Sequence, residues 1–290
     1  MPKKNKVVKL PIEGDDKMNR SNGKDNHTHR LMISTPTLGL FRSEWVNARF
    51  SQTIPTNFSV VDVQNFMNPH MPVGFALADA ENLSAKAFVE GDFEWFLSIE
   101  DDNIIPQGTI LKINDYMIIG DTPIVSGLYF TKSNVPEPIM YRGQGKGHYA
   151  DWKLGEKVWV DGIPFGCTLI HGSIIRALWD ISPEYVVNGV ITRRVFDNTS
   201  EGYIDPVTNG WMSTSGTTDL AFCKKLQTHK IFDAAGWPEF QEKEFPLLVD
   251  TTIFVKHIDR SSGVVYPTHL PKEFLEGKIT WREALKILTN

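Results

Sequence analysis

The strongest constraint on the fold is an alternation of strand and helix patterns in the first half of the chain. Apolar runs at residues 31–35, 58–63 and 94–99 predict strands, and segments with helical spacing of apolar residues follow each of them. Connections this short imply βαβ crossovers. We therefore expect an α/β fold with a Rossmann-like, mostly parallel central sheet flanked by helices, in which ligands bind beyond the carboxyl ends of the strands.

The chain divides into three predicted regions. Residues 1–29 are rich in Lys, Asn, Asp and Gly and predict a flexible N-terminal tail, because they cannot bury enough apolar surface to order themselves. Residues 30–260 predict one large domain, and residues 261–290 predict a C-terminal helical extension. Within the domain, residues 182–216 are rich in Asn, Thr, Ser and Gly and predict a long loop, which is often a lid or a binding loop.

Composition excludes several classes of protein. A formal net charge of -5 creates no overall basic field toward nucleic acid or anionic membranes. The two cysteines lie far apart, which argues against a disulfide framework or a zinc ribbon. Because no apolar run approaches the roughly 20 residues that span a bilayer, and no secretory signal is recognisable, we expect a soluble cytoplasmic protein without a transmembrane segment.

The acidic run at residues 100–102 is the sharpest local signal. It follows the predicted strand 94–99 directly, and the carboxylates of Glu100 and Asp102 can face one point and chelate a hard cation. His257, just after a late predicted strand, could add an imidazole ligand, a mixture that suits Mn²⁺. Each feature also has a structural explanation: the acidic run could cap the helix after Pro106, and a strand-end histidine is often only a hydrogen-bonded surface residue.

Asp219 is a candidate general base. It closes the polar run 214–219 and opens a predicted helix, so its carboxylate could accept a proton from an attacking hydroxyl. The same position also suits a residue that only caps the helix. The sequence contains no P-loop, nucleophile-elbow or zincin motif, which removes those enzyme classes.

Four ordered blocks resemble the GT-A glycosyltransferases of the large family-2-like class, which includes divergent phage and bacterial members. The blocks are residues 31–37, 93–106, 217–226 and 249–257. Their order and separation carry the resemblance, because each block alone is only suggestive. The resemblance implies that residues 30–260 form a GT-A glycosyltransferase domain, with a smaller acceptor-side region.

The resemblance assigns residues to the nucleotide half of the donor. Thr35, Pro36 and Thr37 belong to the block that surrounds the base and ribose. Asp62, near the end of the second predicted strand, is placed by position as a further base or ribose contact. Asn82 is carried over from an Arg-Asn pair on the helix before the acidic strand.

The resemblance also assigns the reacting centre. Asp102 and His257 are implied as metal ligands, Glu100 as a ligand or a contact to the sugar, and Asp101 as a donor contact. Asp219 is implied as the base. The metal would be Mn²⁺ or Mg²⁺ and the donor a nucleotide sugar, most typically a UDP- or GDP-sugar.

Further residues are expected around the donor sugar. The turn 166–172, with Phe165 and His171, would line the sugar, and Trp211 would stack on donor or acceptor. The acceptor is a glycan, a lipid-linked glycan, a protein or a modified DNA base. Transfer is expected to invert the anomeric centre with Asp219 as base, and to retain it if another group serves.

Three departures from the family pattern keep other functions open. Glu100 replaces the first Asp of the metal motif, Thr218 replaces the Glu that precedes the base, and Glu81 replaces the Arg of the Arg-Asn pair. One alternative is a non-catalytic module that binds nucleotide sugars or glycans. Another is a metal-dependent phosphohydrolase, although the carboxylates are few for a two-metal site.

Overall fold

The computed structural model describes residues 31–91, 93–143, 146–198, 200–204, 211–215 and 217–289. In residues 200–204 and 211–215 only the backbone is described. The predicted tail, residues 1–29, and the side chain of Trp211 therefore lie outside the described residues.

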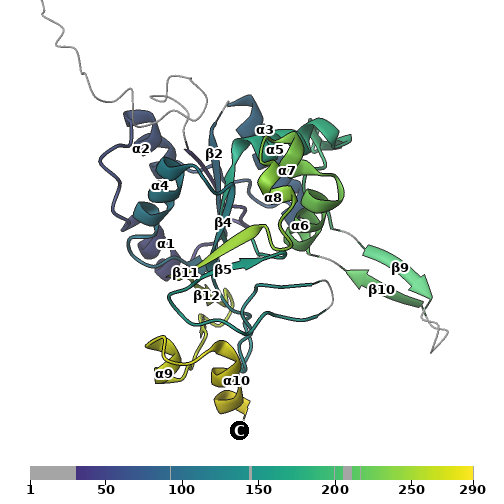
Figure 1. The fold of residues 1–290 in the computed structure, drawn as a ribbon. Helices are drawn as coiled ribbons and strands as arrows, with labels where there is room; N and C mark the ends of the chain where they lie inside the picture. Colours follow the sequence, from purple (N-terminus) through teal and green to yellow (C-terminus); the bar gives the residue numbers. More distant parts are fainter. Residues whose placement is uncertain are drawn as a thin grey trace, which may run out of the picture.

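A six-stranded sheet forms the centre of the molecule (Figure 1). In spatial order its strands are β1 (Leu31–Ser34), β2 (Trp95–Ile99), β6 (Cys167–His171), β4 (Ile124–Leu128), β11 (Leu247–Phe254) and β5 (Lys157–Val160). Only the β1–β2 and β4–β11 pairs are parallel. The pairs β2–β6, β6–β4 and β11–β5 are antiparallel, so the prediction of a mostly parallel sheet was wrong.

The cause lies in residues 166–172, which were expected to form a turn. They include β6, a strand buried along its whole length between β2 and β4, and its direction makes both pairings antiparallel. The Cys167 end of β6 pairs with Ile99, and the His171 end pairs with Trp95. Gly166 therefore lies at the carboxyl end of β2, and His171 lies at the opposite end of the sheet.

Helices cover both faces of the sheet (Figure 1). One face carries α1 (Ser43–Phe50), α2 (Val60–Met67) and α4 (Thr109–Ile119). The other carries α3 (Leu77–Glu90), α5 (Gly172–Ile181), α6 (Thr218–Thr228), α7 (Ile231–Ala234) and α8 (Pro238–Gln241). Successive strand residues point to opposite faces, so Leu97 joins one hydrophobic cluster and Phe96 joins the other. The predicted α/β class is confirmed.

The segment 58–63 is a helix start instead of a strand. Ser59 and Asp62 form a capping box at the N-terminus of α2: the Asp62 amide donates to the Ser59 hydroxyl at 3.1 Å, and the Ser59 amide donates to the Asp62 carboxylate at 3.1 Å. The placement of Asp62 at a strand end was therefore wrong. The edge of β1 is instead paired by the segment 70–74, where the His70 amide donates to the Ile33 carbonyl at 2.8 Å.

The segment 182–216 contains two hairpins instead of one long loop. Strand β7 (Glu184–Val187) pairs antiparallel with β8 (Val190–Arg193), and Asn188 and Gly189 between them have φ of 46° and 83°. An Asn-Gly pair with positive φ is the typical two-residue hairpin turn, so the signal was present in the sequence. Strands β9 (Ser200–Ile204) and β10 (Trp211–Ser215) form the second hairpin, which projects from the body (Figure 1).

The C-terminal elements pack onto the main body. Strand β12 (Lys256–Ile258) lies between β13 (Val265–Tyr266) and β3 (Asn103–Ile104) in a small antiparallel sheet. Helices α9 (Lys272–Leu275) and α10 (Trp281–Thr289) follow. Trp281 is buried against Phe130 and Trp152, so this region shares the larger hydrophobic cluster. Among the described residues, no helix has the length and apolar character needed to cross a bilayer.

His171 provides a test of this packing. It lies against Trp95 and Trp237, and its Nδ1 accepts from the Ser173 amide at 3.2 Å as the N-cap of α5. Burial, with a smaller contribution from Arg176, lowers the pKa of His171 from 6.5 to about 4. The unfolded chain then takes up a proton at higher pH than the folded chain, so stability falls as pH decreases from 6.5 toward 4.

We expect His171→Asn, which retains a capping oxygen, to weaken this pH dependence. The free energy of unfolding of the wild type should lose about 3 kcal/mol more than that of the variant between pH 7 and pH 4. Urea denaturation at both pH values measures the difference. Equal losses in the two proteins would show that His171 is not held neutral by the fold.

Candidate functional site

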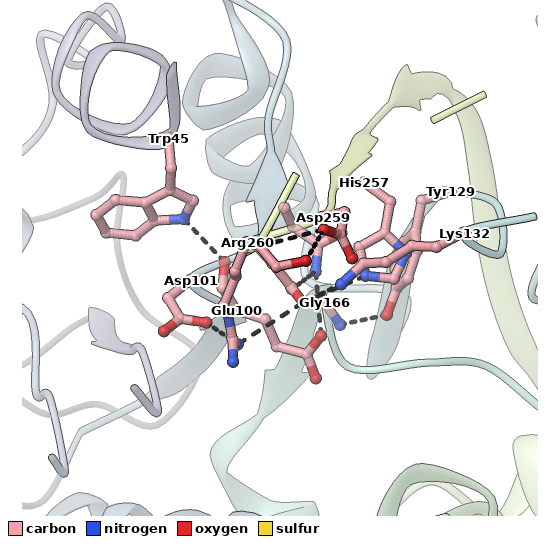
Figure 2. Close-up of polar contacts among 12 residues, drawn as sticks. Trp45, Glu100, Asp101, Tyr129, Lys132, Gly166, His257, Asp259 and Arg260 are labelled. Atoms are coloured by element: carbon pink, nitrogen blue, oxygen red, sulfur yellow. Dashed lines mark hydrogen bonds and ion pairs between the residues drawn. The ribbon is translucent and has the colours of Figure 1, made fainter. Parts of the chain in front are cut away.

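The acidic turn, residues 100–103, lies directly beyond the carboxyl end of β2. Its backbone is closed by the Asn103 amide, which donates to the Glu100 carbonyl at 3.2 Å. The same carbonyl accepts a bond of 2.8 Å from Nε1 of Trp45, a buried residue of α1 (Figure 2). Helix α4 begins only at Thr109, with Gly108 as its N-cap, so the acidic turn does not cap that helix and Pro106 lies before it.

The small sheet brings His257 to the acidic turn. In the β12–β3 pair His257 is opposite Asn103, and the Ile258 amide donates to the Asp102 carbonyl at 2.7 Å. His257 Nε2 consequently lies 3.5 Å from Asp102 Oδ2. The other ring nitrogen, Nδ1, lies 3.0 Å from the carbonyl oxygen of Phe130. Asp102 and His257, which are far apart in sequence, are therefore neighbours at the acidic turn.

The hydrogen bond to Phe130 places a proton on Nδ1 of the His257 ring, and Nε2 is the nitrogen that faces Asp102. A carbonyl oxygen only accepts, so Nδ1 carries a proton, as assigned from this hydrogen bond. In the neutral ring Nε2 then has a lone pair facing the Asp102 carboxylate, another acceptor. Two acceptors facing each other at this distance require a cation or a proton between them. A metal-binding histidine is typically oriented in this way, with its second nitrogen donating to a backbone carbonyl.

Two cationic side chains also reach the acidic turn, and the sequence analysis did not single them out. Lys132 Nζ lies 2.6 Å from Asp102 Oδ2. Arg260 pairs with Asp101, and its Nη2 lies 3.6 Å from Asp102 Oδ2 (Figure 2). Burial opposes ionisation of Asp102, but the hydrogen bonds and charges of His257 and Lys132 outweigh it and lower the pKa of this carboxyl. Asp102 is therefore an anion at neutral pH.

Glu100 differs from its neighbour. Burial raises its pKa to about 8, the charges of Asp102, Asp219 and Asp101 add to the effect, and Arg260 opposes it. Its Oε2 accepts from Asn103 Nδ2 at 3.1 Å, a nitrogen that also lies 3.3 Å from Asp102 Oδ1. Burial therefore favours the protonated form of Glu100 in this arrangement. Its role as a metal ligand stays a prediction.

Asp219 lies in the first turn of α6, where its Oδ1 accepts from the Leu220 amide at 2.9 Å. Thr217, the N-cap, makes no side-chain capping bond. Burial raises the pKa of Asp219, against hydrogen bonds from the Thr217 side chain and the backbone. The charge of Asp219 raises the pKa of Glu100, so the two carboxyls lie within electrostatic range.

Glu81 on α3 joins the same carboxyl cluster, although only its neighbour Asn82 was carried over from the sequence. It is 5% exposed, and its Oε2 has no hydrogen-bond partner among the described residues. Burial and the charge of Glu100 raise its pKa well above the ordinary value, against a hydrogen bond from Thr218. The Glu at an expected Arg position was the available signal.

The side chain of Asn82 makes structural hydrogen bonds within the protein. Its Nδ2 donates to the Phe196 carbonyl at 2.8 Å and to the Tyr185 hydroxyl at 2.9 Å, and its Oδ1 accepts from the Phe196 amide at 2.8 Å. These bonds join α3 to the segment around β7 and β8. The hydrogen-bonding capacity of Asn82 is therefore used internally, as that of Asp62 is used largely by its capping box.

The first motif block lies beside the acidic turn. The Thr35 and Thr37 amides donate to the carbonyls of His70 at 2.9 Å and Pro72 at 3.2 Å, which holds Pro36 between them. The Thr37 hydroxyl bonds to Asp101 and opposes the rise in pKa that burial causes there. Thr35 Oγ1 and Asp101 Oδ2 are buried and lack a partner among the described residues. Within this segment and the acidic turn as described, these two atoms are the unsatisfied polar side-chain atoms of Thr35 and Asp101.

Two expected sugar contacts lie elsewhere. Phe165 is buried between Phe196 and Phe222 in the hydrophobic core. His171 is at the opposite end of β6, so both expectations were wrong. From that stretch Gly166 reaches the site: its carbonyl accepts from the Glu100 amide at 3.2 Å, and its amide donates to the Tyr129 hydroxyl at 2.7 Å.

No group of three or more His, Cys, Asp or Glu side chains within the described ranges is arranged to hold a metal ion. Asp102 and His257 place one oxygen and one nitrogen 3.5 Å apart, and the metal role predicted for them stays a prediction. A metal here would need further ligands from a substrate or from water, which is common for Mg²⁺ beside phosphates.

Comparison with known proteins leaves the family open. No protein-family model and no curated protein matches the chain. The crystal structure of A197 from STIV is similar at 14% identity, covering 79% of this chain and 86% of that one, with a TM-score of 0.46. A glycosyltransferase involved in the glycosylation of the major capsid of PBCV-1 is similar at 13% identity over 52% of this chain and 66% of that one, with a TM-score of 0.25. The resemblance to the GT-A fold stays a prediction.

Gly166 tests how closely the site is packed. A Cβ at this position would overlap Asn103 Nδ2 and Tyr129 Oη, both of which border His257. We expect Gly166→Ala to lower the free energy of unfolding by about 1–3 kcal/mol, the usual cost of overpacking. Gly162→Ala is the matched control, because its Cβ would meet Leu220 and Tyr141 no closer than 3.1 Å. Urea denaturation measures both, and an equal effect would contradict the tight packing around Gly166.

Proposed function

We propose that this chain is a metal-dependent glycosyltransferase that moves a sugar from a nucleotide-sugar donor to an acceptor hydroxyl. The observation that carries the proposal is the pair of Asp102 Oδ2 and His257 Nε2, 3.5 Å apart, with the imidazole oriented by the Phe130 carbonyl. The two residues come from two of the four blocks that resemble family-2-like GT-A enzymes, and they meet where that resemblance predicts a metal.

The donor atoms fit the proposed ion. An ionised carboxylate oxygen and an imidazole nitrogen suit Mn²⁺, and Mg²⁺ would rely more on the carboxylate. When bound, the ion would neutralise charge that develops on the departing nucleoside diphosphate. Asp102 and His257 would hold it, and Glu100 would become a ligand if the ion displaces its proton.

The nucleotide half of the donor would lie on the segment from Thr35 to Thr37. Support comes from two buried atoms that have no partner in the described part of the chain, Thr35 Oγ1 and Asp101 Oδ2. A hydroxyl and a carboxylate are the groups that commonly bond to ribose or base. A buried polar atom without a partner destabilises a protein, and a bound nucleotide would remove that cost.

Asp219 would accept the proton of the attacking acceptor hydroxyl. Its raised pKa supports this role, because a carboxylate base becomes more effective as its pKa approaches the working pH. Direct attack with one carboxylate as base inverts the anomeric centre. The acceptor would be a glycan, a lipid-linked glycan, a protein or a hydroxylated DNA base, and the site does not distinguish them.

A donor panel tests the proposal. UDP-, GDP-, CMP- and dTDP-sugars are incubated with Mn²⁺ or Mg²⁺, and both the melting temperature and the release of free sugar are followed. A donor at 100 times its Kd should stabilise the protein by roughly 2.7 kcal/mol in a metal-dependent way. Asp102→Asn should abolish the shift and the slow hydrolysis.

Asp115→Asn is the control, since Asp115 is an exposed carboxylate on α4. If no nucleotide sugar binds with either metal, the proposal is wrong. Binding without any turnover would favour a non-catalytic module, and hydrolysis at the same rate with every acceptor would favour a phosphohydrolase.

Asp219→Asn tests the role of Asp219 in proton transfer separately from donor binding. The variant keeps the shape of the side chain but accepts no proton, so transfer should slow by about 10²- to 10⁴-fold. Donor affinity should change little, because Asp219 is not expected to contact the metal. Single-turnover kinetics and thermal shift measure the two quantities. In the wild type the rate should rise with pH through the pKa of Asp219, and an unchanged rate in the variant would exclude it as the base.

A further inference from the structure

Lys132 and Arg260 both approach Asp102, the carboxylate to which the proposed function assigns a metal. Lys132 Nζ is 2.6 Å from Asp102 Oδ2, closer than the 3.5 Å of His257 Nε2. Arg260 binds Asp101 and reaches Asp102 Oδ2 at 3.6 Å. Lys132 follows β4 and Arg260 follows β12, so two separate loops bring cations to the same pair of carboxylates (Figure 2).

The two carboxylates and the two basic side chains of this group already balance each other in charge, before any charge on His257 is counted. Asp101 and Asp102 contribute two negative charges, and Lys132 and Arg260 contribute two positive charges. A divalent ion would add two positive charges to a neutral group, and counting Glu100 as ionised would compensate only one of them. The metal alone is therefore expected to bind weakly, because charges in a partly buried site are poorly screened.

A diphosphate restores the balance. The two linked phosphates of a nucleotide sugar carry two negative charges, equal to the charge of the ion. Lysine and arginine are the side chains that bind phosphate oxygens best. The basic side chains are the more exposed partners: those of Lys132 and Arg260 are 28% and 40% exposed, while those of Asp101 and Asp102 are 0% and 11% exposed.

We propose that Lys132 exchanges partners during binding, leaving Asp102 for the diphosphate when the metal takes its place. Arg260 supports the same exchange through Asp101. The exchange makes the binding of metal and of nucleoside diphosphate mutually dependent, so that neither binds tightly alone. This inference rests on the metal and diphosphate part of the proposed function and adds a residue to it that no motif identified.

The exchange predicts opposite effects of one substitution. Lys132→Met keeps an unbranched side chain one atom shorter and removes the charge, so Mn²⁺ no longer competes with an ammonium group for Asp102. The Kd for Mn²⁺ alone should fall about tenfold, an effect of the size found for close charge pairs. The gain in Mn²⁺ affinity caused by nucleoside diphosphate should shrink by at least about fivefold, because the diphosphate loses a partner.

The experiment measures a thermodynamic cycle on the full chain. Free Mn²⁺ is followed by electron paramagnetic resonance during titration, without nucleotide and with saturating UDP or GDP, in the wild type and in Lys132→Met, and a protein-free titration corrects for the Mn²⁺ that the nucleotide itself binds. Lys132→Arg should retain most of the coupling, since it keeps the charge. Lys86→Met is the matched control, because Lys86 pairs with Glu90 on the outer surface of α3.

Tighter Mn²⁺ binding together with weaker coupling in Lys132→Met supports the exchange. Unchanged or weaker Mn²⁺ binding without nucleotide, or coupling equal to the wild type, overturns it. The two proposals can fail separately: coupling that depends on Lys132 without sugar transfer would reject only the transferase, and transfer without that coupling would reject only the exchange.

Discussion

The pairing of β12 with β3 is the interaction on which the candidate site depends. Backbone hydrogen bonds place His257 opposite Asn103 and tie the Ile258 amide to the Asp102 carbonyl. These backbone hydrogen bonds are what hold β12, a strand late in the sequence, against the acidic turn. Because register in a ladder is set residue by residue, a slip of one position would turn the imidazole to the other face. The chemistry therefore depends on a structural feature of only a few residues.

Much of this arrangement could be predicted from the sequence. The acidic turn follows a fully buried strand, and Asp102 and His257, which the resemblance assigned to one metal, lie 3.5 Å apart, while the metal itself stays a prediction. The sheet direction could not be predicted, because an apolar run such as Cys167–His171 has the same pattern in a parallel and an antiparallel pair. Asp62 was misplaced for a related reason: three valines near it favour a strand, and the capping box with Ser59 decided for a helix.

The cations were missed because nothing local marks them. Lys132 and Arg260 each stand in a polar loop, where a basic residue is ordinarily solvated. Only the tertiary structure shows that both side chains approach the carboxylate of Asp102. Glu81 was different, since a Glu on a buried helix face is already unusual in a sequence. Unusual residue types are thus visible in sequence, and ordinary residues brought together by folding are not.

The carboxyls of the site differ in the groups that face them. Asp101 and Asp102 contact basic side chains. Burial raises the pKa of Glu81, Glu100 and Asp219, and the charge of Asp219 adds to this rise at Glu81 and Glu100. A sugar transfer needs both conditions at once. The departing diphosphate is stabilised by positive charge, and the acceptor hydroxyl needs a carboxylate that accepts its proton. The base must be ionised when the acceptor attacks, and a pKa raised by burial makes the ionised Asp219 carboxylate a stronger base, so the burial of this carboxyl favours the proposed reaction.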